Sequence, residues 1–387
     1  MKAITNGKVV TVTGATYEKG TVIVDGSTIV AVGENVEIPA ACEVIDANGG
    51  WITPGLIDCH SHISLMEAYG SMPGMQDYNE FSDPITPQIS AKDALNPFDE
   101  GIAEVMKAGF TTCFTGPGSG NVIGGCGISF KLTGTTAEEM IIEGSQIMKC
   151  ALGENPKRLY GLKDKAPVTR MATAAMFRNT MKQAVEYSDE LKDFENGKID
   201  KKPKFDPKLD ALVQVVRGEM RCKIHCHRAD DITTAIRLAK EFNLDFTLEH
   251  ATEGYKVTDI INEAGVTCII GPLLLQHLKR EVWGLRLDTP AKLYEAGVHI
   301  CLTADEGEGT KNLPTHVGII IKNGLPEKAA FEAVTINAAK ALKLENRIGS
   351  LEKGKDADIA VFDGHPFSNM TNCVMTMING EVCHSKL

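Results

Sequence analysis

Three segments of this chain repeat one design, and that repetition is the strongest constraint on its fold. Residues 107–117, 263–272 and 295–305 each end a helical pattern at an Ala-Gly pair and then continue into an apolar run. A glycine after a helix is a common C-terminal cap, and a near-continuous apolar strand is typical of a sheet that is buried on both faces. The last two segments lie 32 residues apart, which suits one βα unit.

Repeated βα units predict a parallel sheet with helices outside it. A (β/α)8 barrel takes about 250 residues, so a chain of 387 residues has room for a barrel and an accessory domain. An open doubly wound sheet is the alternative, but no Gly-x-Gly-x-x-Gly motif follows an early strand. We therefore expect a closed α/β barrel, the TIM-barrel fold.

The sequence pattern at both ends of the chain differs from the βα pattern of the middle. Short strands separated by Gly and Asp are expected at residues 7–12, 20–26, 29–33, 348–363 and 374–382. Neither end has enough strands for a sandwich of its own, so we expect the two ends to pair. The predicted domains are a small composite β-sandwich, residues 1–52 and 345–387, and a barrel, residues 53–344.

Composition and charge limit the kinds of molecule that this chain can be expected to bind. The net charge of -11 gives no attraction for nucleic acid or an anionic membrane, and no apolar run is long enough to span a bilayer. The 11 cysteines are scattered without CxxC pairs, which favours buried thiols in a reducing compartment. We expect a cytoplasmic homo-oligomer that acts on a small-molecule substrate, with no nucleic-acid or membrane partner.

The segment from Trp51 to His62 gives the first indication of a metal-binding site. It is hydrophobic and ends in two histidines separated by one residue. Side chains alternate between the two faces of a strand, so His60 and His62 point to the same side. Two imidazoles with a shared direction can bind one metal ion if further ligands lie close by.

Further candidate ligands terminate or interrupt other apolar runs, as catalytic residues do at the C-terminal ends of barrel strands. They are Lys149, His225, His227, His250 and Asp305. Any one of these histidines alone is more often structural than a ligand. Because all of these groups fall at expected strand ends, together they predict a metal centre.

Lys149 lies inside the apolar run Ile147-Met-Lys-Cys-Ala-Leu. Burial of an ammonium is costly unless it is paired or chemically changed. A lysine carboxylated by carbon dioxide becomes an anionic oxygen ligand that can bridge two metal ions. A salt-bridged lysine is the alternative, and in that case Glu154 is the candidate carboxylate ligand.

These motifs resemble those of the amidohydrolase superfamily, in particular its branch of imidazolonepropionase and related metal-dependent hydrolases. The matching residues are Pro54-Gly-Leu-Ile-Asp-Cys-His-Ser-His62, Lys149, Lys223-Ile-His-Cys-His227, Glu249-His250, Thr303-Ala-Asp305 and Gly349-Ser-Leu-Glu-Lys-Gly-Lys-Asp-Ala-Asp-Ile-Ala-Val361. The resemblance runs from end to end. It implies a distorted (β/α)8 barrel with a β-sandwich that is built from both termini.

The resemblance also implies a role for each candidate residue. His60 and His62 would be ligands of the more buried metal, Lys149 the bridge, and His225 and His250 ligands of the second metal. Asp305 would be both a ligand and the catalytic proton shuttle. His227 is assigned to substrate contact or to a supporting position around the ligands, because the family pattern gives the ligand role to the first histidine of the pair.

The expected reaction is hydrolysis of a C–N bond in an amide or a cyclic amide, with one or two divalent ions per subunit and zinc as the expected metal. Arg170 and Arg178 are candidates for a carboxylate-binding guanidinium, with a helix-surface arginine as the alternative. Deamination of an aminated heterocycle is a rival activity, although His225-Cys-His-Arg lacks the acid typical of deaminases. A metallo-dipeptidase is a further alternative, and a non-catalytic metal-binding scaffold is the alternative outside enzymes.

Overall fold

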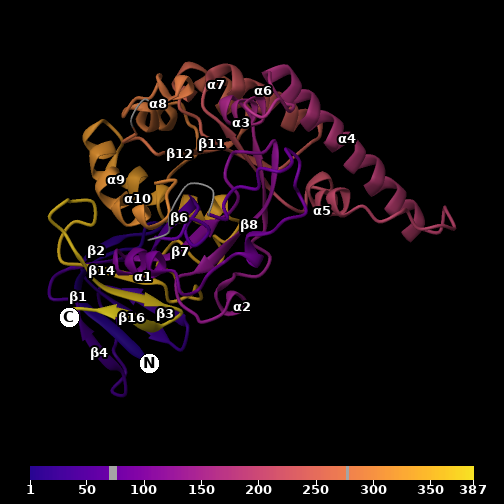
Figure 1. The fold of residues 1–387 in the computed structure, drawn as a ribbon. Coiled ribbons are helices and arrows are strands. Elements are labelled where there is room, and N and C mark those ends of the chain that lie inside the picture. The colour runs from indigo at the N-terminus through magenta and orange to yellow at the C-terminus, as the bar shows by residue number, and fades with distance from the viewer. Residues whose placement is uncertain (69–75, 276–278) are drawn as a thin grey trace.

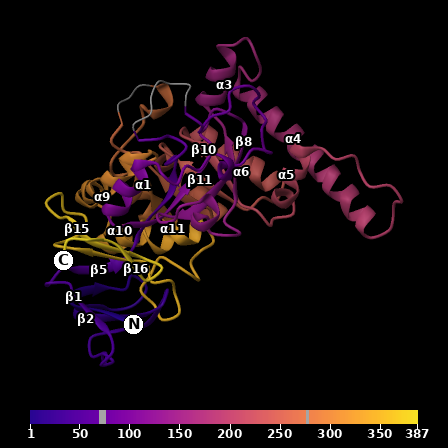
Figure 2. The same cartoon turned by 60° about the horizontal axis from the view of Figure 1, so that its bottom comes forward.

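The structure is a computed structural model that describes residues 1–68, 76–275 and 279–387 (Figures 1 and 2). Strands from both ends of the chain form one eight-stranded sheet, in which β14 pairs antiparallel with β5. Its strands are β1 (Lys2–Val10), β2 (Thr16–Asp25), β3 (Thr28–Gly33), β4 (Glu43–Asp46), β5 (Trp51–Pro54), β14 (Ile359–Phe362), β15 (Cys373–Ile378) and β16 (Glu381–Ser385). The two termini lie at this sheet in both views.

The terminal sheet is sandwich-like and has a core of its own. That core is formed by alternate residues of strands from both ends of the chain, among them Ile4, Val22, Ile52, Ile359 and Met375. The predicted pairing of the two ends is therefore confirmed. The predicted boundary between residues 52 and 53 falls within β5.

The second sheet is the barrel, and its strands are buried on both faces. In spatial order they are β6 (Leu56–Ser61), β7 (Phe110–Thr115), β8 (Ile123–Lys131), β9 (Ile147–Ala151), β10 (Cys222–Cys226), β11 (Phe246–His250), β12 (Thr267–Ile270) and β13 (Ile300–Leu302). All neighbours pair in parallel except β8, which runs antiparallel to both β7 and β9. The predicted distorted (β/α)8 barrel is confirmed, with β8 as its main distortion.

The first and last barrel strands meet and nearly close the ring. Thr303 Oγ1, just after β13, donates to the carbonyl oxygen of His60 at 2.5 Å. The backbone N–H of Ala304 donates to Asp58 Oδ2 at 3.3 Å, and Asp58 Oδ1 accepts from the N–H of His60 at 3.1 Å. The ends of β6 and β13 are thereby held together.

Helices surround the barrel in the order expected for βα units. They are α1 (Glu100–Lys107), α2 (Ala137–Met140), α3 (Glu154–Gly161), α4 (Arg170–Glu195), α5 (Pro207–Val216), α6 (Ala229–Glu241), α7 (Thr258–Ala264), α8 (Thr289–Glu295), α9 (Leu313–Lys322), α10 (Glu327–Ala333) and α11 (Ile336–Ala341). Short 3-10 helices η1 (Ala91–Asp93), η2 (Gly254–Lys256), η3 (Arg280–Val282) and η4 (Glu308–Asn312) lie in the loops. Within the described ranges, none of the helices combines the length and the hydropathy needed to cross a bilayer.

The three repeated segments are the helix-to-strand turns α1–β7, α7–β12 and α8–β13. Gly109, Gly265 and Gly297 follow these helices with φ angles of +95°, +63° and +84°. These are left-handed conformations that glycine adopts without a Cβ penalty, as a helix cap requires. The predicted helix, cap and buried strand are confirmed in each case.

Helices α4 and α5 form a hairpin that projects from the barrel, as Figure 1 shows. Tyr187 and Leu191 of α4 pack against Val213 of α5 in a small apolar cluster. Asp206 caps α5 by accepting from the N–H groups of Lys208 and Leu209. The hairpin therefore has its own local packing outside the barrel.

An ion-pair network joins the N-terminal ends of two barrel strands. Asp245, before β11, accepts from Arg221 Nε at 2.9 Å and lies 2.6 Å from Lys343 Nζ. Arg221 also donates to the carbonyl oxygens of Lys340 and Ala341 at the end of α11. Burial alone would raise the pKa of Asp245, but Lys343 and Arg221 outweigh burial and lower that pKa below its usual range. This end of a barrel serves stability rather than catalysis.

We expect Asp245→Asn to lower the free energy of unfolding at pH 7 by on the order of 1 kcal/mol. A lowered folded-state pKa stabilises the fold above the unfolded pKa of the carboxyl, and this contribution is lost as the pH falls through the folded value. The difference between the variant and the unmodified protein should therefore vanish in strong acid. Urea unfolding from pH 7 down into strong acid measures it, and Asp200→Asn, at an exposed position, is the matched control. A pH-independent difference would contradict the electrostatic explanation.

Candidate metal centre

The C-terminal ends of five barrel strands bring the predicted ligands together. β6 supplies His60 and leads to His62, β9 supplies Lys149, β10 supplies His225 and leads to His227, β11 ends at His250, and Asp305 follows β13. Asp305 Oδ1 lies 3.1 Å from His60 Nε2 and 3.3 Å from His62 Nε2. Lys149 Nζ lies 3.2 Å from His60 Nε2.

Two clusters within this group have the spacing of metal ligands. The first is His60, His62 and Asp305, and the second is His225, His227 and His250; in each, one ligand atom per residue lies within 4.8 Å of the others. The clusters adjoin, because the ring centroids of His60 and His250 are 5.0 Å apart. The residues could therefore hold one ion or two neighbouring ions.

Contacts made by Nδ1 orient three of the rings. His62 Nδ1 donates to the carbonyl of Gly116 at 2.8 Å, and His250 Nδ1 donates to the carbonyl of Gly271 at 2.6 Å. His60 Nδ1 contacts the Glu249 carboxylate. Because Nδ1 carries the proton in these rings, Nε2 keeps its lone pair for a ligand, which is the usual arrangement around metals.

His225 supplies a direct test of whether a metal fits. Its Nδ1 is buried and has no hydrogen-bond partner among the described residues. A buried nitrogen of this kind needs a partner, and a metal ion would provide one. Burial, the largest cause, lowers the pKa of His250 to about 4 and that of His225 well below its usual range. The rings are therefore neutral at neutral pH, which is the form that binds metals.

Backbone conformations at two strand ends are strained in the way that functional sites often are. His250 has φ +70°, Ala251 has φ +42° and Asp305 has φ +54°. Non-glycine residues in the left-handed region cost about 1–3 kcal/mol each. Two of these residues, His250 and Asp305, are themselves candidate ligands.

Lys149 is fully buried within β9. Burial, the largest cause, lowers its pKa to about 8 although Glu249 and Asp305 oppose this effect. More of the amine is therefore neutral at neutral pH than in an exposed lysine. Neutral amine is the form that reacts with carbon dioxide.

The sequence predicted no role for Glu249 and Lys223, which lie beside the candidate ligands and help to hold them in place. Lys223 Nζ lies 3.3 Å from Glu249 Oε2, and both side chains are fully buried. Thr247 Oγ1 donates to Glu249 Oε1 at 2.5 Å. Although burial would raise the pKa of Glu249, Lys223 and His60 lower it, so the carboxylate stays charged and orients His60. The signal in the sequence was a charged residue inside each of two apolar strands.

Glu154, the alternative ligand, lies in neither cluster. Its N–H donates to Glu281 Oε2 at 2.8 Å, and its own carboxylate accepts from the N–H of Glu281 at 3.4 Å. A Cβ on the adjacent Gly153, which has φ +84°, would come within 2.8 Å of Glu281 Oε2. The two glutamates thus clamp the start of α3 against η3.

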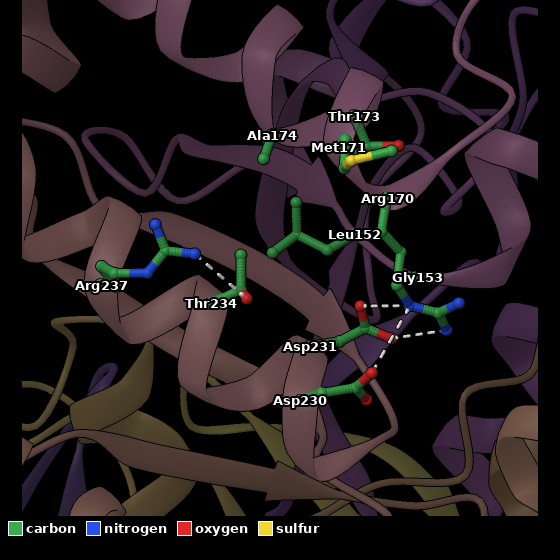
Figure 3. A pocket seen from close by; sticks show the side chains of 10 residues that line it. All are labelled: Leu152, Gly153, Arg170, Met171, Thr173, Ala174, Asp230, Asp231, Thr234 and Arg237. Atoms are coloured by element: carbon green, nitrogen blue, oxygen red, sulfur yellow. Dashed lines mark hydrogen bonds and ion pairs between the residues drawn. The ribbon is translucent and has the colours of Figure 1, made fainter.

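Arg170 and Arg178 are both paired with carboxylates on α6. Arg170 donates to Asp231 through Nε and Nη2 at 2.8 and 2.9 Å, as Figure 3 shows, and Arg178 Nε donates to Glu241 at 2.8 Å. Arg170 lines a small cavity of about 190 Å³ whose lining includes none of the predicted metal ligands. Both guanidinium groups are therefore already paired with a carboxylate of this chain.

A larger cavity of about 560 Å³ opens beside the first cluster and is lined by His62 and Asp305. Tyr78 and Phe81 contribute aromatic rings to it, whereas Arg158 and Lys279 contribute positive charge. No ion pair joins Arg158 to any other residue in the described ranges, and its side chain was not singled out from the sequence. Because Asp305 and Glu306 also line it, the cavity is suited to a small molecule with apolar and charged parts, and Arg158, unpaired among the described residues, is the group placed to meet an anionic part.

Comparisons with known proteins agree with this geometry. A model of the amidohydrolase family matches residues 51–383. The crystal structure of an amidohydrolase from Thermotoga maritima MSB8 is 36% identical, covers 100% of both chains and has a TM-score of 0.95. Imidazolonepropionase from Fusobacterium nucleatum is 25% identical over 386 residues, with 89% of this chain and 85% of that enzyme covered. Amidohydrolase tasK from Hapsidospora irregularis is 28% identical over 372 residues, which cover 89% of this chain but only 37% of tasK.

These matches confirm the family that the sequence motifs predicted. With the clustered ligands, they make the chain a metal-dependent hydrolase that acts on carbon–nitrogen bonds other than peptide bonds. The chain belongs to the amidohydrolase family, in the branch related to imidazolonepropionase.

Proposed function

We propose that this chain hydrolyses an amide or cyclic amide bond in a small molecule that carries a carboxylate. The observation that carries the proposal is the convergence of His60, His62 and Asp305 beside a cavity that also presents Arg158 and Lys279. A guanidinium and an ammonium favour a carboxylate in the ligand. Cyclic amides with an acidic side chain and N-acyl amino acids share that feature, and dipeptides remain the substrates of the alternative metallo-dipeptidase.

We propose zinc as the metal, because an imidazole-rich donor set suits it. His60, His62 and Asp305 would hold one ion, and His225 and His250 would hold a second. A bound divalent ion lowers the pKa of water to about 7 and polarises a carbonyl group. We also propose that Lys149 is carboxylated and contributes oxygen ligands, which its burial, its lowered pKa and its contact with His60 support.

Asp305 is the proposed proton shuttle. Burial would raise its pKa, but His250, His60 and His62 keep that pKa well below its usual range, so the side chain is an ionised base. When water adds to the substrate carbonyl, the carboxylate accepts a proton from it. The same proton then goes to the departing nitrogen as the C–N bond breaks, so the products are a carboxylic acid and an amine.

Removal of metal tests this proposal. We expect dialysis against a chelator to abolish hydrolysis and added Zn²⁺ to restore it, because the substrate carbonyl and the water both need the ion. The substrates are a panel of N-acyl amino acids, dipeptides and cyclic ureides or lactams, with and without a carboxylate, and release of amine or carboxylate is measured. Ammonia release from aminated heterocycles with every amide left intact would contradict the proposal and favour a deaminase. Activity that survives complete metal removal would also contradict it.

We further propose a cytoplasmic location, which the eleven free cysteines, most of them buried, support. The expected homo-oligomeric state stays a prediction, and light scattering during gel filtration measures it. A small-molecule substrate follows from the family.

A further inference from the structure

His227 has a position that the family pattern does not explain. Its side chain is buried, and its ring centroid lies 4.7 Å from that of His225 and 4.8 Å from that of His250. The rings of His225 and His250 are themselves 4.5 Å apart. The three imidazoles therefore form a triangle with nearly equal sides at the ends of β10 and β11.

The orientation of His227 is fixed by a neighbour outside this triangle. Its Nδ1 lies 2.7 Å from Thr252 Oγ1, and Thr252 is buried as well. Its Nε2 lies 3.2 Å from Lys279 Nζ, which can only donate, so Nε2 is the acceptor with a lone pair. His227 thus has the same pattern as His62 and His250, in which Nδ1 is anchored and Nε2 is left for a ligand.

A buried carboxylate, Glu281, and its lysine partner lie beside the triangle. Glu281 Oε1 lies 3.6 Å from His227 Nε2 and 3.8 Å from His225 Nε2, and the Glu281 side chain is fully buried. Lys279 Nζ lies 2.8 Å from the same oxygen and 3.2 Å from Asn155 Oδ1. If His227 binds a metal, Lys279 keeps two of its three partners, so the change costs it one contact.

We infer that His227 is a third imidazole ligand of the second metal, together with His225 and His250. This inference rests on the proposed function, because it adds a ligand to the same centre. Three nitrogen donors favour Zn²⁺ or Co²⁺ over Mn²⁺ or Mg²⁺ at this position, since the latter prefer oxygen ligands. The second position should then be the more selective one for nitrogen-preferring metals.

The test is metal binding by His227→Asn. The asparagine amide can keep a donor near Thr252, whereas it has no atom at the position of Nε2. Metal-free protein is titrated with Zn²⁺ in a metal buffer and its content is measured by mass spectrometry, and a parallel Co²⁺ titration follows the visible spectrum of each equivalent. His384→Asn, in β16 of the terminal sheet, is the matched control.

We expect the unmodified chain and His384→Asn to bind two equivalents, and His227→Asn to keep the first and bind the second at least about 100-fold more weakly. Retention of the first equivalent shows that the variant is folded at the site. Unchanged binding of both equivalents with a raised KM would overturn the inference and make His227 a substrate contact. Binding of only one equivalent of metal by every protein would overturn the inference about His227 but not the proposed function. If none of the proteins binds a metal ion, both the inference and the proposed function are overturned.

Discussion

Asp305→Asn is expected to lower kcat by about 10²–10⁴-fold. The amide has the shape of the carboxylate but cannot accept the proton of the attacking water. Because Asp305 Oδ1 also lies within 3.3 Å of His60 and His62 Nε2, the variant should bind its first metal more weakly. Measurement of kcat at saturating substrate and saturating Zn²⁺ separates the loss of the proton shuttle from the loss of metal.

Glu308→Gln is the control for this variant, because Glu308 lies in η4 of the same loop and does not line the larger cavity. It should keep kcat within about twofold of the unmodified enzyme, because the change removes only a half-exposed ion pair with Lys311. An Asp305→Asn enzyme with full metal content and more than a tenth of normal kcat would rule out the proton-shuttle role.

Glu249→Gln is expected to have the largest effect on stability, about 3–5 kcal/mol. The substitution leaves the Lys223 ammonium fully buried without its carboxylate. It also removes the charged partner of His60 Nδ1. Chemical unfolding of the metal-free protein measures the first effect, and Zn²⁺ affinity measures the second.

The double variant Lys223→Met, Glu249→Gln separates these two effects. Without the lysine no unpaired ammonium is left at position 223, so most of the lost stability should return. Zn²⁺ affinity should stay about 10–100-fold low, because His60 still lacks its orienting carboxylate. Recovery of both stability and affinity in the double variant would show that Glu249 does not act through His60.

Much of the fold could be predicted because its signals are local. The Ala-Gly pairs before β7, β12 and β13 mark helix ends that need left-handed residues, and the apolar runs after them mark buried strands. The reversal of β8 could not be predicted in this way. An antiparallel strand buried on both faces is as apolar as a parallel one, so direction depends on distant partners that local sequence does not encode.

Candidate ligands could be found for a related reason. His60, His62, His225, His250 and Asp305 each lie in the last residues of an apolar strand or just after it, and such positions meet at one end of a barrel. The contacts of Arg170 could not be found, since Asp231 lies on a different helix and only the packing of α4 on α6 joins them. Glu249 was missed likewise, because its role depends on the neighbouring side chains of Lys223 and His60.

The most direct test of the account is a crystal structure of the zinc-loaded protein with anomalous scattering recorded at the zinc edge. We expect one anomalous peak within about 2.0–2.2 Å of ligand atoms of His60, His62 and Asp305. We expect a second peak against His225, His227 and His250. Peaks only at surface residues, or none at the ends of β6, β10 and β11 in protein that is active, would contradict this expectation.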